Sequence, residues 1–157
     1  MPVHYQGTSE EVRALEAWVK LNRGLETVQA RLQAKLAEAG LTERQLGVLE
    51  ALLHLGPMCQ RELGKKLLRG DSNMTAVLET LERDEMVRRT RRAEDRRQVL
   101  VELTPRGRER IEAVFPDHVR EVKRVMGALT GEEQEALAKL CKKLGLGNQS
   151  GVAREAV

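Results

Sequence analysis

Aromatic residues are scarce in this chain: 157 residues contain one tryptophan, one tyrosine and one phenylalanine. Proteins that bind single-stranded nucleic acid stack bases on several aromatic side chains, so this composition excludes that class of RNA and single-stranded DNA modules. Long hydrophobic runs are missing as well, and the N-terminus lacks the apolar stretch of a signal peptide. We therefore expect a protein that makes no contact with a membrane and stays in the cytoplasm.

Cysteines and catalytic motifs are equally few. Cys59 and Cys141 are the two cysteines, too few for a disulfide framework. They form no C-x-x-C pair and no cysteine–histidine cluster with the spacing of metal ligands, so we expect neither a metal site nor a cofactor. The three histidines are scattered, and no P-loop, nucleotide-binding glycine motif or nucleophile elbow occurs. The sequence thus predicts that the protein is not an enzyme.

The positive charge is concentrated in one segment. The formal net charge is only +3, yet residues 86–97 (MVRRTRRAEDRR) hold six arginines against Glu94 and Asp95, a net charge of +4. The rest of the chain therefore sums to −1. Such a concentration is typical of a surface that contacts phosphates, although a solvated strand whose arginines pair with nearby acids is the other interpretation.

The first quarter of the chain predicts one long amphipathic helix that ends at Gly40, with apolar residues recurring every three or four positions. At ~1.5 Å per residue this helix is about 45 Å long. A compact chain of this size has a diameter of only about 40 Å, so one subunit cannot cover the apolar stripe by itself. We infer a homodimer in which residues 1–41 form an N-terminal dimerisation helix.

Residues 42–104 predict a separate lobe. Thr42 and Gln45 form a capping box that begins a helix ending at Gly56-Pro57, and two short helices follow, over about 60–68 and from Asp71 or Ser72 onward. The hydrophobic period then changes from 3.6 to 2, which indicates two strands, 86–92 and 99–103, joined by a turn at 93–96. This order of two short helices and a basic hairpin predicts a winged helix-turn-helix that binds double-stranded DNA.

The remaining residues predict two more helices and a tail. Thr104 and Pro105 begin the first, and a second capping box, Thr130 with Glu133, begins the last, which should end at Gly145. We assign 105–146 to C-terminal dimerisation helices and expect 147–157 to be disordered. The predicted fold is mainly α with a small antiparallel β-hairpin wing.

The second short helix and the wing supply the expected DNA contacts. Small polar side chains let a helix approach base edges in the major groove, and an arginine at the hairpin tip can enter a narrow minor groove. Asp95 can orient Arg97 through a charge-assisted hydrogen bond. The candidate DNA-binding residues are Arg69, Ser72, Asn73, Thr75, Ala76, Thr80, Arg92, Asp95, Arg96 and Arg97.

The stretch EDRRQVLVELTPRG (94–107) resembles the wing and following helix start of the MarR family of bacterial transcriptional regulators, in which D-x-R precedes an alternating strand and L-T-x-x-G. The resemblance extends back through residues 60–89. It implies an intertwined dimer, Asp95 and Arg97 in the wing, and the face of residues 72–80 in the major groove. Many members carry a basic residue where this chain has Ala76, which argues against a phosphate contact from that position.

A narrower resemblance concerns the effector. Trp18, His54 and the run FPDH, with Phe115 and His118, are similar to features of the quinone- and hydroquinone-responsive branch of these repressors. In the family, effectors bind a crevice between the dimerisation helices and the DNA-binding lobe. The four side chains are thus candidate ligand-binding residues for a small aromatic effector, and packing in the core is the alternative role for each.

Together these resemblances imply a repressor that a small aromatic ligand releases from DNA. Two alternatives to this function remain. The first is a redox or electrophile switch at Cys59, because this residue precedes a predicted helix whose dipole favours a reactive thiolate. The ordinary role of such a cysteine is that of a buried structural residue. The other is a winged-helix module that binds protein and never contacts DNA. Salt-dependent binding to duplex DNA distinguishes that module from a regulator, which we expect in the cytoplasm at the nucleoid.

Overall fold

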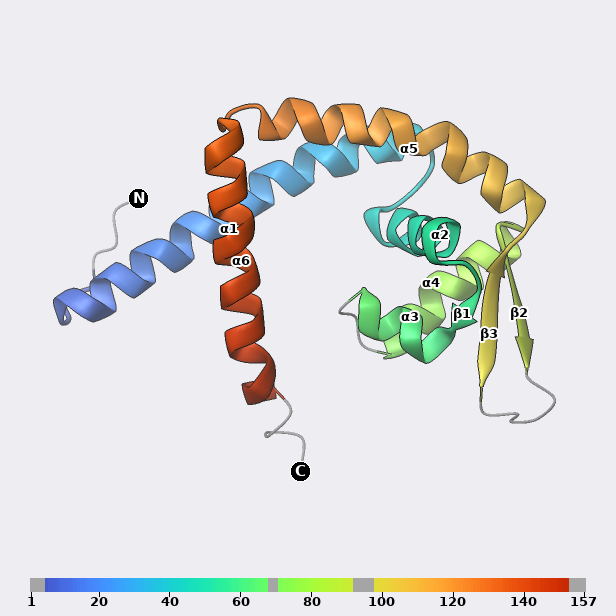
Figure 1. The fold of residues 1–157 in the computed structure, drawn as a ribbon, viewed down its shortest axis with the longest axis horizontal. Coiled ribbons are helices and arrows are strands. Elements are labelled where there is room, and N and C mark those ends of the chain that lie inside the picture. The colour runs from blue at the N-terminus through green and yellow to red at the C-terminus, as the bar shows by residue number, and fades with distance from the viewer. Residues whose placement is uncertain (1–4, 68–70, 92–97, 153–157) are drawn as a thin grey trace. The chain divides into compact units, whose positions relative to one another are not determined.

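The structure, a computed structural model, describes residues 5–67, 71–91 and 98–152; of residues 71–73 and 148–152 it describes the backbone. The chain divides into two compact units, Met1–Glu121 and Val122–Val157. Figure 1 shows the elements along the chain. Within the described ranges these are the helices α1 (Ser9–Glu38), α2 (Glu43–Leu55), α3 (Gln60–Lys66), α4 (Asp71–Arg83), α5 (Pro105–Met126) and α6 (Gly131–Val152), and the strands β1 (Met58–Cys59), β2 (Val87–Arg91) and β3 (Val99–Leu103). The mainly helical fold with a β wing is confirmed.

Hydrogen-bonded caps begin the helices at the threonines that the sequence indicated. Thr42 Oγ1 accepts from the backbone N–H of Gln45, and the Gln45 side chain accepts from the N–H of Thr42. Thr130 and Glu133 form the same reciprocal pair before α6. Each box satisfies two backbone donors that a helix start otherwise leaves without partners. A third box at Thr8, which the sequence analysis missed, begins α1.

The sheet has three strands in the order β1-β3-β2, all antiparallel. β2 and β3 form the predicted hairpin, with Arg89 opposite Val101. β1 was not predicted, because two residues are too few to show an alternating pattern. β3 is thus the central strand and β1 and β2 are the two edges, with α4 packed next to β2.

The hydrophobic core is formed by α2, α3, α4 and the sheet, and it continues to Leu36 at the end of α1 and to Ile111 of α5. Val48 and Leu49 of α2 are fully buried, as is Val101 of β3. One side of α4 packs into the same core through Met74, Leu78 and Leu81. The predicted inward face of α4 is thus confirmed for these three residues, and the opposite side of the helix remains available for contacts.

A tight junction joins α4, β2 and the start of α5. Glu85 has a φ of +58°, a left-handed conformation that closes the turn after α4. Thr104 Oγ1 donates to the Glu85 carbonyl (2.6 Å) and accepts from the N–H of Gly107 (3.0 Å), and its N–H donates to the Met86 carbonyl (3.1 Å). This is the structural role of the L-T-x-x-G motif: it caps α5 and holds the base of the wing.

Replacing Glu85 by glycine is expected to stabilise the protein. A residue with a Cβ has a cost of about 1 kcal/mol in the left-handed region, and glycine removes it. Glu85 also forms an ion pair with Arg106 (3.0 Å). Both side chains are mostly exposed, so losing this pair costs little stability. We expect the free energy of unfolding to rise by about 0.5 kcal/mol in urea titrations, and Arg106→Gln measures the ion pair separately. A lower stability for Glu85→Gly would contradict this account of the turn.

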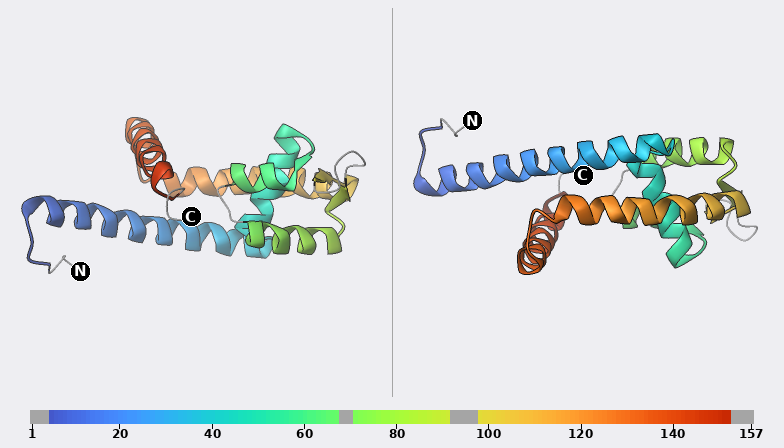
Figure 2. Two further views of the ribbon diagram at one scale, coloured as in Figure 1. Left: turned by 90° about the horizontal axis from the view of Figure 1, so that it is seen from below. Right: turned by 90° about the horizontal axis from the view of Figure 1, so that it is seen from above.

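The last turns of α1 lie beside the first half of α5 (Figure 2), where the Arg110 side chain donates to the Ala39 carbonyl. Farther toward its N-terminus, α1 has exposed apolar residues, with Trp18 59% and Leu25 49% accessible in the single chain. The long helix predicted from the sequence is confirmed, and so is its uncovered apolar stripe.

The second unit contains α6, whose start is fixed by Gln134 Nε2 donating to the carbonyls of Met126 and Leu129. α6 continues to Val152, so the prediction that this helix ends at Gly145 was wrong, and the expected disorder was wrong for residues 147–152. Residues 153–157 of that tail lie outside the described part of the chain. Glycine retains its backbone N–H and only weakens a helix, and no proline follows to end it. Leu140 and Leu144 are exposed on α6 in the single chain. In the part of the chain described, every helix is too short or too polar to cross a bilayer.

Candidate nucleic-acid interface

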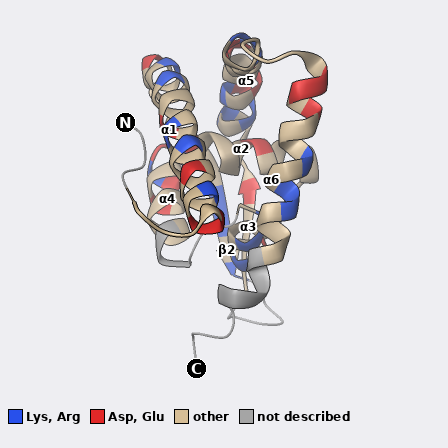
Figure 3. Cartoon of the chain, turned by 90° about the vertical axis from the view of Figure 1, so that its left-hand side faces the viewer, with Lys and Arg blue, Asp and Glu red and all other residues tan. Residues whose placement is uncertain are grey.

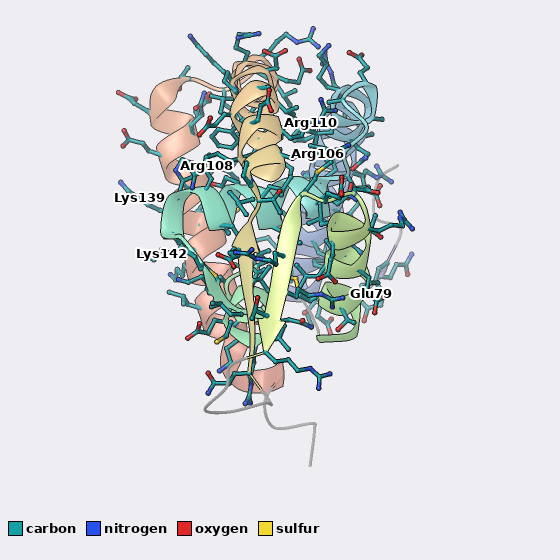
Figure 4. The ribbon with its side chains drawn as sticks, turned by 90° about the vertical axis from the view of Figure 1, so that its right-hand side faces the viewer. Glu79, Arg106, Arg108, Arg110, Lys139 and Lys142 are labelled. Carbon is teal, nitrogen blue, oxygen red and sulfur yellow. The ribbon has the colours of Figure 1, made fainter. Side chains whose placement is uncertain are left out.

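The outward face of α4 is free of the core. Ala76 and Glu79 are exposed, and Thr80 is half-buried; Figure 4 labels Glu79 on this helix. The Thr80 hydroxyl donates to the Ala76 carbonyl (3.1 Å), as a threonine within a helix commonly does. Among its described residues, the side of α4 away from the core therefore presents the small side chains of Ala76 and Thr80 and the carboxylate of Glu79.

Thr75 connects α4 with the helix before it. Its Oγ1 accepts a hydrogen bond from Gln60 Nε2 (2.9 Å), and the residue is half-buried. Gln60 is the first residue of α3, so this bond joins the two helices of the helix-turn-helix. Thr75 was predicted as a base contact, and the structure shows that it also has this internal role.

Some of the predicted DNA contacts fall outside the described part of the structure. Their expected roles in binding DNA stay predictions from the sequence. These residues are Arg69, Arg92, Asp95, Arg96 and Arg97, together with the side chains of Ser72 and Asn73.

The described arginines of the wing have two kinds of surroundings. Arg88 bonds Glu102 across the hairpin (2.8 Å), and Arg89 bonds Glu82 of α4 (2.6 Å). Arg91, at the end of β2, is exposed. For comparison, acidic and basic side chains are interspersed along α1 (Figure 3), so positive charge is not concentrated on that helix. The interpretation of the basic run as paired with nearby acids thus applies to Arg88 and Arg89.

The Glu82–Arg89 pair was missed by the sequence analysis. The Arg89 guanidinium holds the pKa of the Glu82 carboxyl below its ordinary value. A lowered pKa means that the pair stabilises the fold above the unfolded-state pKa and that this contribution is lost as the pH falls through the folded-state pKa. The sequence signal that could have indicated this pair was an acidic residue at the end of the second short helix and an arginine in the strand that follows it.

Three of the four predicted effector residues come together. The rings of His54 and Phe115 meet edge to face with centroids 5.7 Å apart, and those of Phe115 and His118 lie 6.4 Å apart. Trp18 does not share this cluster in one chain: it lies 18 residues before Leu36, which faces α5, or about 27 Å along α1. Trp18 thus lies outside this cluster within one chain, and its expected role in binding an effector stays a prediction.

Among the hollows of the described part of the first unit, two lie against α1. The larger, about 820 Å³, is an open groove between α1, the start of α2 and α4, with Gln29, Gln33, Arg44, Ala76 and Thr80 on its walls. The smaller, about 220 Å³, separates α1 from α5 and includes Lys35 and His118. Ala76 and Thr80, both predicted DNA contacts, thus lie where a molecule in the larger groove would touch α4.

Cys59, the candidate redox residue, lies at the N-cap of α3 and is half-buried. Its N–H donates to Glu62 Oε2 (3.1 Å), and its Sγ is 3.6 Å from Gln98 Oε1 beside β3. Cys141 is exposed on α6. The thiol of Cys59 therefore lies beside the start of β3, at the turn end of the hairpin, and not in the core.

Comparison with known proteins agrees with this geometry. The model of the MarR family matches residues 41–99, the lobe that contains α2–α4 and the hairpin. An HTH-type transcriptional regulator of Bacillus subtilis, YkoM, whose own role is uncharacterized, is 31% identical over 141 residues, which are 89% of this chain and 92% of YkoM. The chain belongs to the MarR family. It is therefore a DNA-binding transcription regulator of the winged helix-turn-helix type and not an enzyme.

Two further relatives of this MarR protein inform its mechanism. The transcriptional regulator MhqR of B. subtilis is 28% identical over 134 residues, covering 85% of this chain and 92% of MhqR. BpsR of Bordetella bronchiseptica, whose DNA binding is regulated by 6-hydroxynicotinic acid, has a solved structure with a TM-score of 0.77 and 27% identity, covering 83% of this chain and 98% of BpsR. These similarities do not assign the chain to a branch of the family.

Proposed function

We propose that this MarR protein is a homodimeric repressor that binds a pseudo-palindromic operator through α4 and the wing. The observation that carries the proposal is the exposed face of α4 beside a hairpin with a strongly basic sequence. Two recognition helices related by a two-fold axis meet successive major grooves when the half-site centres are one helical turn, ~34 Å, apart. Such a protein acts in the cytoplasm, at the nucleoid.

Exposed apolar residues at both ends of the chain support the dimer. Trp18 and Leu25 of α1 and Leu140 and Leu144 of α6 are each about half accessible or more in the single chain. Helices with such faces bury them against another helix. Residues 1–41 and 105–146 of two copies would supply those partners, and residues 42–104 would remain free to bind DNA.

A small aromatic effector would release the operator from this dimer. The large groove supports this role, because Ala76 and Thr80 on its wall belong to α4 and a ligand there would touch the recognition helix. A ligand that prefers one spacing of the two lobes shifts the dimer toward that spacing. BpsR responds to 6-hydroxynicotinic acid, so phenols, quinones and hydroxylated aromatic acids are the compounds to test first.

Selection of bound duplexes from a random DNA pool tests the regulator. We expect a two-fold symmetric motif whose binding weakens steeply with salt, because phosphate contacts release counterions. Arg97→Ala should reduce affinity most at A·T-rich flanks, and Asn73→Ala should relax base preference within the half-site by roughly 1–3 kcal/mol. Recovery of no motif, with weak binding that ignores salt, would reject the proposal.

Thiol sensing through Cys59 is the second candidate function. The position of its Sγ beside Gln98 favours it, since a modified thiol there would disturb the start of β3, next to the turn of the wing. Loss of DNA binding after treatment with an oxidant or an alkylating quinone, with Cys59→Ser resistant and Cys141→Ser still sensitive, would identify this mechanism. Equal sensitivity of the Cys59→Ser variant would exclude it.

A further inference from the structure

Among the described residues, an ion pair between Glu82 and Arg89 joins the recognition helix to the wing. Glu82 lies in the last turn of α4, and Arg89 is the central residue of β2. Arg89 Nε and Nη2 donate to Glu82 Oε2 at 2.8 and 2.6 Å, and the backbone N–H of Arg89 donates to Oε1 at 3.2 Å. Both carboxylate oxygens are thus engaged by one residue, through its side chain and its backbone.

The contact uses the free edge of the sheet. β2 is an edge strand, and the N–H of Arg89 donates to Glu82 instead of to a neighbouring strand. The Arg89 side chain is only 23% exposed, so water competes less for its guanidinium than for those of Arg88 and Arg91. Three charge-assisted bonds from two directions hold a strand in one orientation more firmly than a single ion pair does.

A second pair on the same strand provides a comparison. Arg88 and Glu102 bond at 2.8 Å, but they join β2 to β3 within the hairpin and do not reach α4. Arg88 is 69% exposed. The two pairs have the same chemistry and lie one residue apart, yet only Glu82–Arg89 connects the helix with the hairpin.

We propose that Glu82 and Arg89 are positioning residues for operator recognition, which set the angle between α4 and the β2–β3 hairpin so that both meet the DNA as one rigid unit. The proposal rests on the proposed function, in which α4 reads the half-site and the wing contacts its flanks. Without the pair, the fold persists through its core, but the hairpin is no longer held at the angle that brings it to the flanks.

The test compares Glu82→Gln with Glu102→Gln on two duplexes, the full selected operator and a core operator whose flanks are truncated. The wild type should lose about tenfold in affinity when the flanks are removed. Glu82→Gln should bind the core duplex with the affinity of the wild type, but its affinity should increase little when the flanks are present. Glu102→Gln should show the same increase in affinity from the flanks as the wild type. Hydroxyl-radical footprints should show flank protection for the wild type and Glu102→Gln and reduced protection for Glu82→Gln.

A double-mutant cycle completes the experiment. Arg89→Gln should have the effect of Glu82→Gln, and the double variant should be no worse than either, because both remove one contact. If Glu82→Gln loses the same affinity on both duplexes, the variant has a general loss of structure. If its affinity increases as much from the flanks as that of the wild type, the pair has no positioning role. Either result overturns the inference. A wild type that gains nothing from the flanks would instead refute the proposed contact of the wing.

Discussion

Replacing Gly107 by alanine is expected to destabilise the protein by about 3 kcal/mol, near the upper end for an overpacked site. Gly107 lies in the first turn of α5, where the backbone of Met86 passes directly against it. A Cβ at this position would overlap the Met86 carbonyl oxygen and lie 2.7 Å from the carbonyl carbon. Backbone cannot move aside as a flexible side chain can, so relieving the overlap would break the Thr104 bonds that hold the wing base. Urea titration followed by circular dichroism measures the loss.

Gly47→Ala is the matched control, since Gly47 is also helical and lies within the same lobe. An added Cβ there would meet Leu67 Cδ2 at 3.6 Å, an ordinary contact. Alanine favours a helix over glycine by roughly 0.5–1 kcal/mol, so this variant should be at least as stable as the wild type. Similar stabilities for the two alanine variants would show that the close approach at Gly107 is not a constraint.

Replacing Leu140 and Leu144 together by glutamate is expected to lower operator affinity at least about 100-fold, because it would convert the proposed dimer into monomers. In a dimer, binding of one lobe to its half-site holds the second lobe near the other half-site at a high effective concentration. This linkage raises affinity by roughly 10²–10⁴ over that of separate lobes. Both leucines are more than half exposed in the single chain, so their replacement leaves the monomer fold intact. Light scattering gives the molecular mass, and titration of a labelled operator gives the affinity.

Lys139→Gln with Lys142→Gln is the control for charge. Both lysines are labelled on α6 in Figure 4, and the helical period places them on the side opposite the two leucines. The change in net charge, −2, equals that of the double glutamate variant. We expect this control to remain dimeric and to bind the operator. A dimer that survives the leucine replacements would mean that α6 does not form the interface.

Most of the secondary structure followed from local rules. The capping boxes at Thr42 and Thr130 and the cap at Thr104 were each readable from residues three positions apart, since the donors they satisfy belong to the same turn. The inward face of α4 was predictable for the same reason: Met74, Leu78 and Leu81 recur with the helical period. Errors occurred where local signals are weak, as at Gly145 and in the two residues of β1.

The amino-acid sequence by itself determined the order of helices and strands, the winged helix-turn-helix and the resemblance to MarR regulators, because caps, periodicity and short motifs depend on neighbours in the chain. Only the tertiary structure decided which distant residues meet. It joined Glu82 to Arg89, brought His54 to Phe115 and pressed Met86 against Gly107. Such contacts depend on how elements pack, and many packings are compatible with one pattern of local preferences.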